Sequence, residues 1–318
     1  MKKYLITGFS GFVSKHFMEH LSATGEPCEV IGISRSQAEP VHYDHLQVRT
    51  YQIDLKNAQL VREIIGSVKP NYIIHLASES SVAYSWQNPL ESFQNNTNIF
   101  LNLVESVRVS NLKCRILSIG SSEEYGIVDP ATLPLTEKHE FNPISPYAVA
   151  RVSQEMLSKI YVNGFGLDII ITRSFNHIGP GQKENFVVSS FVKQIVERKA
   201  NNISDPMEVG NVAIVRDFLD VRDVVKAYMC LLKKGVKGEV YNVCTGVGYS
   251  LEDIVTRILK ITNAKISYLV KPELVRPSDN PIIIGSNFKL KNLGDWEPLI
   301  SIDESLLDIV KYWEKKLS

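Results

Sequence analysis

The strongest constraint on the fold is the regular alternation of short apolar runs with longer amphipathic segments through residues 1–175. This alternation is typical of βαβ units, in which a helix follows each strand of a parallel sheet. We expect strands at Tyr4–Thr7, Glu29–Ser34, Gln47–Asp54, Tyr72–Leu76, Arg115–Gly120 and Asp168–Arg173. We expect helices at Gly11–Thr24, Asn57–Val68, Pro89–Ser110 and Ser145–Gly164. The pattern predicts an α/β protein with a Rossmann-type, doubly wound parallel sheet.

The order loosens after Asn176, where a helix at Asn185–Lys199 is followed by short strands, further helices and turn-rich pieces such as "KPELVRPSDN". We expect residues 176–318 to form mainly a smaller C-terminal lobe, with some segments returning to the sheet. Ligands of open α/β sheets bind at the carboxyl ends of the strands. The smaller lobe is therefore the expected substrate-binding part.

Composition excludes several classes of function. The 35 Lys and Arg residues balance the 35 Asp and Glu residues, so neither nucleic-acid binding nor an acidic tail is indicated. The N-terminal "MKKYLITGFSGF" is broken by glycines and favours a strand and turn over a signal peptide. No apolar stretch approaches the roughly 18 residues of a membrane span. The four cysteines, Cys28, Cys114, Cys230 and Cys244, are scattered without paired spacing. We therefore expect a protein of the reducing cytoplasm that has no metal site.

A glycine loop lies between the first expected strand and helix, in "LITGFSGFVSKHF". Glycine lets main-chain N–H groups approach a pyrophosphate, which then binds at the helix N-terminus. Ser14 stands where a third glycine is common, and a small side chain is tolerable there. Residues 1–175 are therefore a predicted dinucleotide-binding domain, with the loop contacts made by Gly8, Phe9, Ser10, Gly11, Phe12 and Val13.

The second strand ends in "GISRS", where a dinucleotide-binding domain specific for NAD would have an acidic residue for the ribose. Arg35, flanked by Ser34 and Ser36, instead suits a 2′-phosphate. We therefore favour NADP (NADPH) over NAD. A solvated loop arginine is the alternative.

Two further strand ends face the expected cofactor. In "QIDL", Asp54 can accept a hydrogen bond from the adenine amino group, although it can equally cap the next helix. In "HLASESS", His75 is expected to be structural. The residues expected to line the cofactor at these two strand ends are Asp54, Leu55, Leu76, Ala77 and Ser78.

The fifth strand ends in "LSIGSSEEYG", which brings Ser121, Ser122 and Glu123 to the carboxyl edge, and "SPYAVAR" opens the following helix. Tyr147 and Arg151 are four residues apart and share a helix face. A hydroxyl, a phenol and a cation can bind a carbonyl and exchange its proton while a nicotinamide transfers hydride. An ordinary amphipathic pair of helix residues is the alternative.

These motifs, with "RSFNHIGPGQ", "AIVRDFLDVRDVV", "YNVCTG" and "VRPSD", resemble the extended short-chain dehydrogenases/reductases, also called the NAD-dependent epimerase/dehydratase family. Within that family the chain looks most like the GDP-6-deoxy-D-mannose reductases. The resemblance runs from about Lys3 to the last helix. It implies reduction of the C4 keto group of GDP-4-keto-6-deoxy-D-mannose to GDP-D-rhamnose with NADPH, in cytoplasmic nucleotide-sugar biosynthesis.

The resemblance also implies roles for the central residues. Tyr147 matches the general acid, Ser121 the group that polarises the carbonyl, and Arg151 the family lysine that bridges the nicotinamide ribose and assists the tyrosine. Arginine keeps the charge but is planar and longer, so we expect slower turnover with NADP binding largely kept. Unlike lysine, it cannot lose a proton to a relay.

Other functions stay open. Glu123 matches the acid and base of the related 4,6-dehydratases, so a dehydratase or a 4-epimerase is the alternative enzyme, although the short chain favours the reductase. A binding protein impaired in catalysis by Arg151 is a further alternative. UDP, CDP and dTDP sugars are alternatives to the GDP-sugar.

The resemblance implies substrate contacts from Ser81, Ser122, Asn176, Arg216 and Arg276, with the two arginines in loop-like contexts binding phosphate. Surface salt bridges with nearby aspartates are the alternative for the arginines. His177 is expected near nicotinamide or as a structural group. The helices Pro89–Ser110 and Ser145–Gly164 match those that pair in the family's homodimer, with apolar positions at Phe93, Phe100, Val104, Met156, Leu157 and Ile160, which intramolecular packing explains equally well.

Overall fold

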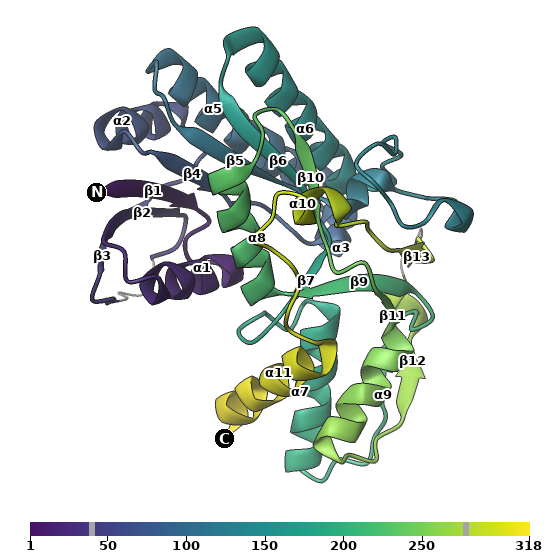
Figure 1. The fold of residues 1–318 in the computed structure, drawn as a ribbon. Coiled ribbons are helices and arrows are strands. Elements are labelled where there is room, and N and C mark those ends of the chain that lie inside the picture. Colours follow the sequence, from purple (N-terminus) through teal and green to yellow (C-terminus); the bar gives the residue numbers. More distant parts are fainter. Residues whose placement is uncertain (38–41, 276–279) are drawn as a thin grey trace.

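A computed structural model of the chain describes residues 1–37, 42–275 and 280–318. Its large lobe is built on a seven-stranded parallel sheet in the order β10-β6-β5-β4-β1-β2-β3 (Figure 1). The order reverses beside β1, which gives the crevice typical of a doubly wound sheet and confirms the predicted Rossmann-type fold. The strands are β1 (Lys2–Thr7), β2 (Cys28–Ser34), β3 (Leu46–Gln52), β4 (Tyr72–His75), β5 (Arg115–Ser121), β6 (Asp168–Ser174) and β10 (Val240–Val243).

Helices cover both faces of this sheet. On one face α1 (Phe12–Ala23) and α8 (Val221–Lys234) pack in a core that includes Ile6 and Phe17. The other face is covered by α2 (Ala58–Val68), α5 (Ile99–Val109) and α6 (Pro146–Phe165). The central strands of the sheet are buried on both faces and therefore consist of continuous apolar runs. For this reason the sequence predicted the ends of these strands to within a few residues.

The expected helix at Pro89–Ser110 is interrupted. It consists of α4 (Pro89–Phe93), a π-helical turn (Gln94–Asn98) and α5, preceded by α3 (Val82–Gln87). The fully buried Asn96 accepts from the main-chain N–H of Glu79 at 3.0 Å and donates to Ser92 O at 2.8 Å. This buried amide ties the turn to the loop after β4.

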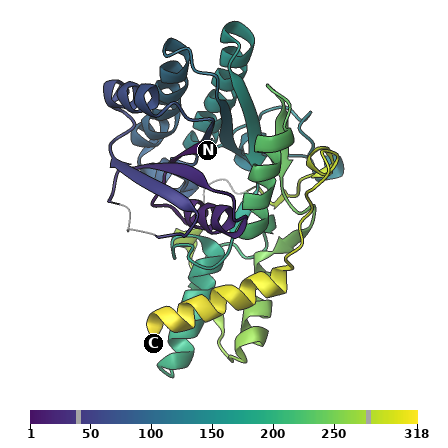
Figure 2. The same ribbon diagram turned by 60° about the vertical axis from the view of Figure 1, so that its left-hand side comes forward.

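The smaller lobe packs α7 (Val187–Ala200), α9 (Leu251–Thr262) and α11 (Ile302–Leu317) around one apolar core, with α11 crossing beside α7 in Figure 2. Although β10 and α8 follow residue 176, they lie in the large lobe (Figure 1). In the part of the chain that the structure describes, no helix has the length and apolar character needed to cross a membrane. The remaining elements are β7 (Asn176–Ile178), β8 (Met207–Val209), β9 (Val215–Asp220), β11 (Gly248–Ser250), β12 (Tyr268–Val270), β13 (Ile282–Ile283) and α10 (Phe288–Lys291).

A buried ion pair fixes α6 to the sheet. Arg173 in β6 lies 3.0 Å from the carboxylate of Glu155 in α6, and both side chains are almost wholly buried. The guanidinium also lies over the rings of Tyr125, at 4.7 Å, and Phe141, at 4.5 Å. Lys159 donates to the same carboxylate at 2.7 Å. These contacts set the distance between β6 and the N-terminal half of α6.

We predict that Arg173→Met lowers the free energy of unfolding by about 3–5 kcal/mol, because it leaves the Glu155 carboxylate buried without its main partner. Urea unfolding at neutral pH measures the loss. The double variant Arg173→Met with Glu155→Leu is the control, and it should recover most of the lost stability. A loss below about 1 kcal/mol in the single variant would show that the pair is only a surface-type contact.

Candidate active site

The glycine loop between β1 and α1 is a tight turn. Gly8 has φ +69°, and a Cβ on it would lie 2.8 Å from the main-chain nitrogen of Ala77. Gly11 donates to Gly8 O at 2.9 Å and is the N-cap of α1, so no side chain covers the first N–H groups of this helix. An anion can therefore approach these groups closely. The loop fits the pyrophosphate of a dinucleotide.

The other residues predicted around the loop have different positions. Phe9 is buried, with its ring where a side chain on Gly32 would be. Ser10 is exposed, Phe12 lies beside Gly179 and Gly181, and Val13 packs on the core of the α1 face. After β4 come the half-buried residues Leu76, Ala77 and Ser78.

A cation and two hydroxyls gather where β2 ends. Ser36 Oγ donates to Ser10 Oγ at 3.0 Å, and Ser34 Oγ donates to Ser36 O at 2.7 Å. Arg35 between them is exposed. The bond between Ser36 and Ser10 thus joins the end of β2 to the glycine loop, and the site can bind a dianion with its cation and its hydroxyl groups.

Asp54 lies just after the end of β3. Asp54 is exposed and accepts from the main-chain N–H of Lys56 at 2.9 Å. The alternative role as helix cap is wrong, because Asn57 caps α2 by accepting from the N–H of Leu60. The Leu55 side chain is buried in the core beneath α2.

Ser121 ends β5 and is held in a reciprocal turn. Its Oγ accepts from the N–H of Glu123 at 3.2 Å, and its own N–H donates to Glu124 Oε1 at 2.7 Å. Ser122 is buried and Glu123 is partly exposed, whereas Glu124 is fully buried. Glu124 was not predicted from the sequence, since two adjacent glutamates give no signal for which one turns inward.

Tyr147 and Arg151 lie together in α6, whose N-cap Ser145 accepts from Ala148 N–H at 3.1 Å. The guanidinium carbon of Arg151 is 5.1 Å from the centre of the Tyr147 ring, and both side chains are buried. Arg151 Nη1 donates to Ile119 O in β5 at 3.0 Å and to Gln154 Oε1 at 2.7 Å. A phenol thus lies beside a fixed cation at the strand end that carries Ser121.

Neutral polar groups surround this pair. Tyr228 OH lies 3.0 Å from Ser174 Oγ and 3.1 Å from His177 Nε2, and burial lowers the pKa of His177 to about 4. Burial, with a smaller effect of the Arg151 charge, lowers the pKa of His75 to about 3. His75 Nδ1 lies 2.9 Å from Thr7 Oγ1, which agrees with the structural role expected for this histidine. The chain Ser174–Tyr228–His177 had no sequence signal, because Tyr228 lies on the distant helix α8.

The residues predicted to bind substrate lie in several different elements. Asn176 and His177 are partly exposed in β7, and Ser81 caps α3 by accepting from Tyr84 N–H at 3.1 Å. The sequence predicted Arg216 in a loop, and this is wrong, because Arg216 lies buried in strand β9. Its Nη1 donates to Asn280 O at 2.7 Å. The sequence "VRDFLD" reads as polar but forms a strand inside the smaller lobe. Arg276 lies outside the described residues.

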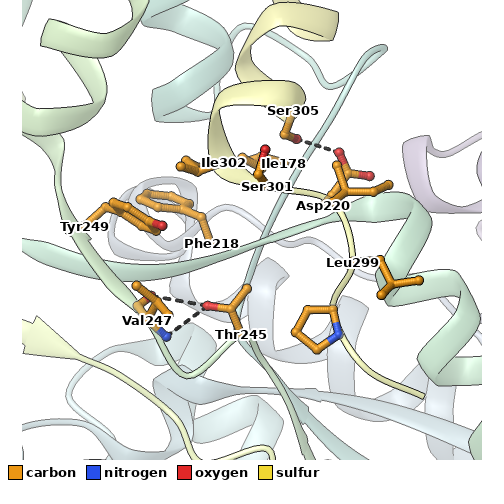
Figure 3. A pocket seen from close by; sticks show the side chains of 12 residues that line it. Ile178, Phe218, Asp220, Thr245, Val247, Tyr249, Leu299, Ser301, Ile302 and Ser305 are labelled. Carbon is orange, nitrogen blue, oxygen red and sulfur yellow. Dashed lines mark hydrogen bonds between the residues drawn. The ribbon is translucent and has the colours of Figure 1, made fainter. Parts of the chain in front are cut away.

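Residues 1–37, 42–275 and 280–318 offer no metal site but do enclose a further cavity. None of them form a cluster of three or more histidine, cysteine or acidic side chains fit for a metal ion, and the four cysteines are buried and free. A cavity of about 210 Å³ lies between α11, β9 and the loop before β11. Figure 3 shows the side chains that line it. Ser305 donates to Asp220 at 2.5 Å at its edge. No predicted site residue is among the residues that line it.

The chain is similar to known proteins over nearly its whole length. The profile of the family described as GDP-mannose 4,6 dehydratase matches residues 5–309. The chain belongs to this family. The resemblance found in the sequence is confirmed, and the chain is an enzyme of the class of nucleotide-sugar oxidoreductases, epimerases and dehydratases.

Individual members of the family match over nearly their full length. A GDP-6-deoxy-D-mannose reductase of Pseudomonas aeruginosa is 32% identical, with 99% of this chain and 98% of that protein covered. A GDP-6-deoxy-D-talose 4-dehydrogenase of Aggregatibacter actinomycetemcomitans is 30% identical over 92% of this chain and 90% of its own. The solved RMD of P. aeruginosa complexed with NADPH has a TM-score of 0.86 at 31% identity and covers 99% of this chain and 100% of its own. The UDP-glucose 4-epimerase of Thermotoga maritima, solved with UDP-glucose, has a TM-score of 0.89 at 27% identity and covers 99% of this chain and 100% of its own.

We predict that His75 lowers the free energy of unfolding of this protein in mild acid. The unfolded chain protonates this histidine near pH 6.5, whereas the folded chain does so only near pH 3. The contribution of the neutral His75 to the free energy of unfolding is therefore complete above pH 6.5. It is lost as the pH falls below that value, by about 1.4 kcal/mol per pH unit. Urea unfolding from about pH 7 to 5 measures it. His75→Gln should flatten the curve, and an unchanged slope would contradict the assignment.

Proposed function

We propose that the chain is an NADP-dependent reductase of the C4 keto group of a GDP-4-keto-6-deoxyhexose, converting GDP-4-keto-6-deoxy-D-mannose to GDP-D-rhamnose. The observation that carries the proposal is the Tyr147 ring, 5.1 Å from the Arg151 guanidinium, on the helix that is hydrogen-bonded to β5 near Ser121. Similarity to a GDP-6-deoxy-D-mannose reductase over 99% of the chain supports the choice of substrate.

The residues divide the work of carbonyl reduction. Ser121 Oγ already accepts from Glu123 N–H, so its own proton is available to the carbonyl oxygen. Tyr147 gives its proton to that oxygen as the alcohol forms, and the Arg151 charge stabilises the phenolate left behind. The reduced nicotinamide, when bound, supplies the hydride.

The cofactor is proposed to be NADPH. The glycine loop fits a pyrophosphate, and Arg35 with Ser36 and Ser10 offers a cation and hydroxyls to a 2′-phosphate. The similar RMD was solved with NADPH, whereas a UDP-glucose 4-epimerase of similar fold was solved with NAD. Asp54, Leu76, Ala77, Ser78 and His177 are proposed to line the remainder of the cofactor. Free buried cysteines support a cytoplasmic setting.

The substrate is proposed to lie against Ser81, Ser122 and Asn176, with Arg276 on its diphosphate. Arg216 is placed to support this region from β9 through its bond to Asn280 O. Glu123, partly exposed beside Ser121, is the residue that keeps a dehydratase as the alternative, and dehydratases are also similar to the chain.

We predict that the purified protein consumes NADPH with GDP-4-keto-6-deoxy-D-mannose and forms GDP-D-rhamnose, and that Arg151→Lys turns over about ten-fold faster, because an ammonium makes more compact ribose contacts. Absorbance at the nicotinamide band and chromatography of the sugar nucleotide measure both. Conversion without net NADPH consumption would indicate the dehydratase or epimerase. Binding of both ligands without conversion by either protein would indicate a binding protein.

We predict that Gly8→Ala weakens NADPH binding about ten-fold or more, because its Cβ would lie 2.8 Å from Ala77 N and displace the loop. Gly25→Ala is the matched control: Gly25 has φ +66°, yet nothing lies within 4 Å of its Cβ. Both variants carry similar backbone strain, and Gly8→Ala adds the contact with the Ala77 main chain, so thermal unfolding is measured for both and binding is compared where both are folded. Fluorescence titration with NADPH should separate them, and equal affinities would contradict the proposed loop contact.

The chain is further proposed to form a homodimer through α4 and α6. Leu90, Phe93, Met156 and Ile160 on these helices are 71%, 38%, 54% and 55% exposed. Apolar exposure of this extent on adjacent helices is characteristic of an interface. Two of the positions expected there, Phe100 and Val104, are wholly buried against the sheet and serve the monomer core.

We predict that Met156→Glu converts the dimer to a folded monomer, because the interface would have to bury an unpaired carboxylate. Light scattering coupled to gel filtration measures the mass, and circular dichroism checks the fold. Lys311→Glu on the exposed face of α11 is the control and should stay dimeric. A wild-type monomer at micromolar concentration would contradict the proposal.

A further inference from the structure

Gln154 lies in α6, three residues after Arg151, and is 1% exposed. Its Nε2 donates to Ser118 Oγ at 2.9 Å and to Ile119 O at 3.1 Å. Ser158 Oγ donates to the same Ser118 Oγ at 3.1 Å. Ile119 O is a carbonyl that can only accept, so it fixes Nε2 as the end of the amide that faces the strand. The other end, Oε1, is left to accept from the guanidinium.

Arg151 depends on that acceptor. Its Nη1 donates both to Gln154 Oε1, at 2.7 Å, and to Ile119 O, while its Nε is buried without a hydrogen-bond partner. A planar guanidinium has a defined orientation, which an ammonium does not need. These two acceptors hold the plane where its carbon lies 5.1 Å from the Tyr147 ring.

We propose that Gln154 is a positioning residue that holds the Arg151 guanidinium beside Tyr147. The inference deepens the proposed reductase function and rests on it. Without the amide, Nη1 keeps only Ile119 O, and the side chain is free to rotate away from the phenol. Misplacement of a charged group by about 1 Å can cost up to 100-fold in rate.

The test is a double-mutant cycle with Gln154→Leu and Arg151→Met. We expect Gln154→Leu to lower kcat about ten-fold with the KM for the sugar nucleotide kept, and the double variant to be no slower than Arg151→Met, because the two residues act as a unit. Ser153→Ala is the control, since Ser153 Oγ donates only within its own helix, to Val149 O. Multiplicative losses in the double variant would overturn the inference.

A crystal structure of Gln154→Leu separates this inference from the proposed function. A guanidinium displaced from the Tyr147 ring supports the positioning role even if the wild-type protein reduces no sugar nucleotide tested. A guanidinium that stays in place overturns it, whatever the rate. Lack of NADPH consumption by the wild-type protein contradicts the reductase alone.

Glu124 carries a second inference through different contacts. It is fully buried, and its Oε1 accepts from the main-chain N–H of Ser121 at 2.7 Å. Gly120 makes room for it, since a Cβ there would lie against this carboxyl. Oε2 has no hydrogen-bond donor, and the carboxyl of Glu155, already bound to Arg173, lies within hydrogen-bonding reach.

Two neighbouring buried carboxyls are costly to ionise together, so one of them binds a proton. Arg173 and Lys159 keep Glu155 in its charged form, which assigns the proton to Glu124. Burial, and after it the Glu155 charge, raises the pKa of Glu124 well above its usual range. We infer that Glu124 positions Ser121 as a neutral acid, bonded to its N–H on one side and to Glu155 on the other.

Glutamine is the conservative replacement, because its oxygen accepts from Ser121 N–H and its amide donates to Glu155. We expect Glu124→Gln to keep kcat within about three-fold, and Glu124→Met to lower kcat about ten-fold with the KM for NADPH unchanged. The surface change Glu140→Gln is the control. An equal loss in the glutamine and methionine variants would mean that Glu124 transfers a proton itself, and full activity of the methionine variant would remove its positioning role.

Infrared spectroscopy tests the same inference without turnover. A protonated carboxyl band in the wild-type protein at neutral pH that disappears in Glu124→Gln is the expected result. Its absence from the wild-type spectrum overturns the neutral acid. This reading does not depend on whether the protein proves to be a reductase.

Discussion

The site depends on the contacts of the Arg151 guanidinium, which is buried between the ring of Tyr147 and the end of strand β5. A buried cation is costly unless it is hydrogen-bonded. Here Ile119 O and Gln154 Oε1 satisfy Nη1, and the Tyr147 ring offers its negative face. Arg151 therefore has a structural role besides its charge. It links helix α6 to the strand that carries Ser121.

Helix α6 is linked to the sheet a second time, one turn further along. Glu155 binds Arg173 in β6, and Glu124 lies between Glu155 and Ser121. The side chains proposed for chemistry are thus held by residues that do not contact substrate. Because both links run through α6, a change in this helix is transmitted to the phenol and the hydroxyl together. Rigid elements of this kind suit a reaction that requires close alignment.

Much of the fold followed from the sequence, because buried parallel strands form apolar runs and helix α6 begins with Ser145 and Pro146, a cap and a first-turn proline. The pairing of Tyr147 with Arg151 followed from their helical spacing. Other features depend on tertiary structure. The break at Asn96 needs the loop that its amide binds, and the burial of Arg216 needs strand β9 inside the smaller lobe. Likewise, Gln154 reads as a helix surface residue until Ser118 is placed opposite it.

In the proposed reaction, Tyr147 and Arg151 assist hydride reduction at the sugar C4 atom. The most direct measurement uses NADPH deuterated at the transferable C4 position, with GDP-4-keto-6-deoxy-D-mannose, and locates the label by mass spectrometry and NMR. The account predicts one deuterium at C4 of GDP-D-rhamnose for each NADPH oxidised. Product without the label, or conversion of the sugar with no oxidised cofactor released, would contradict it.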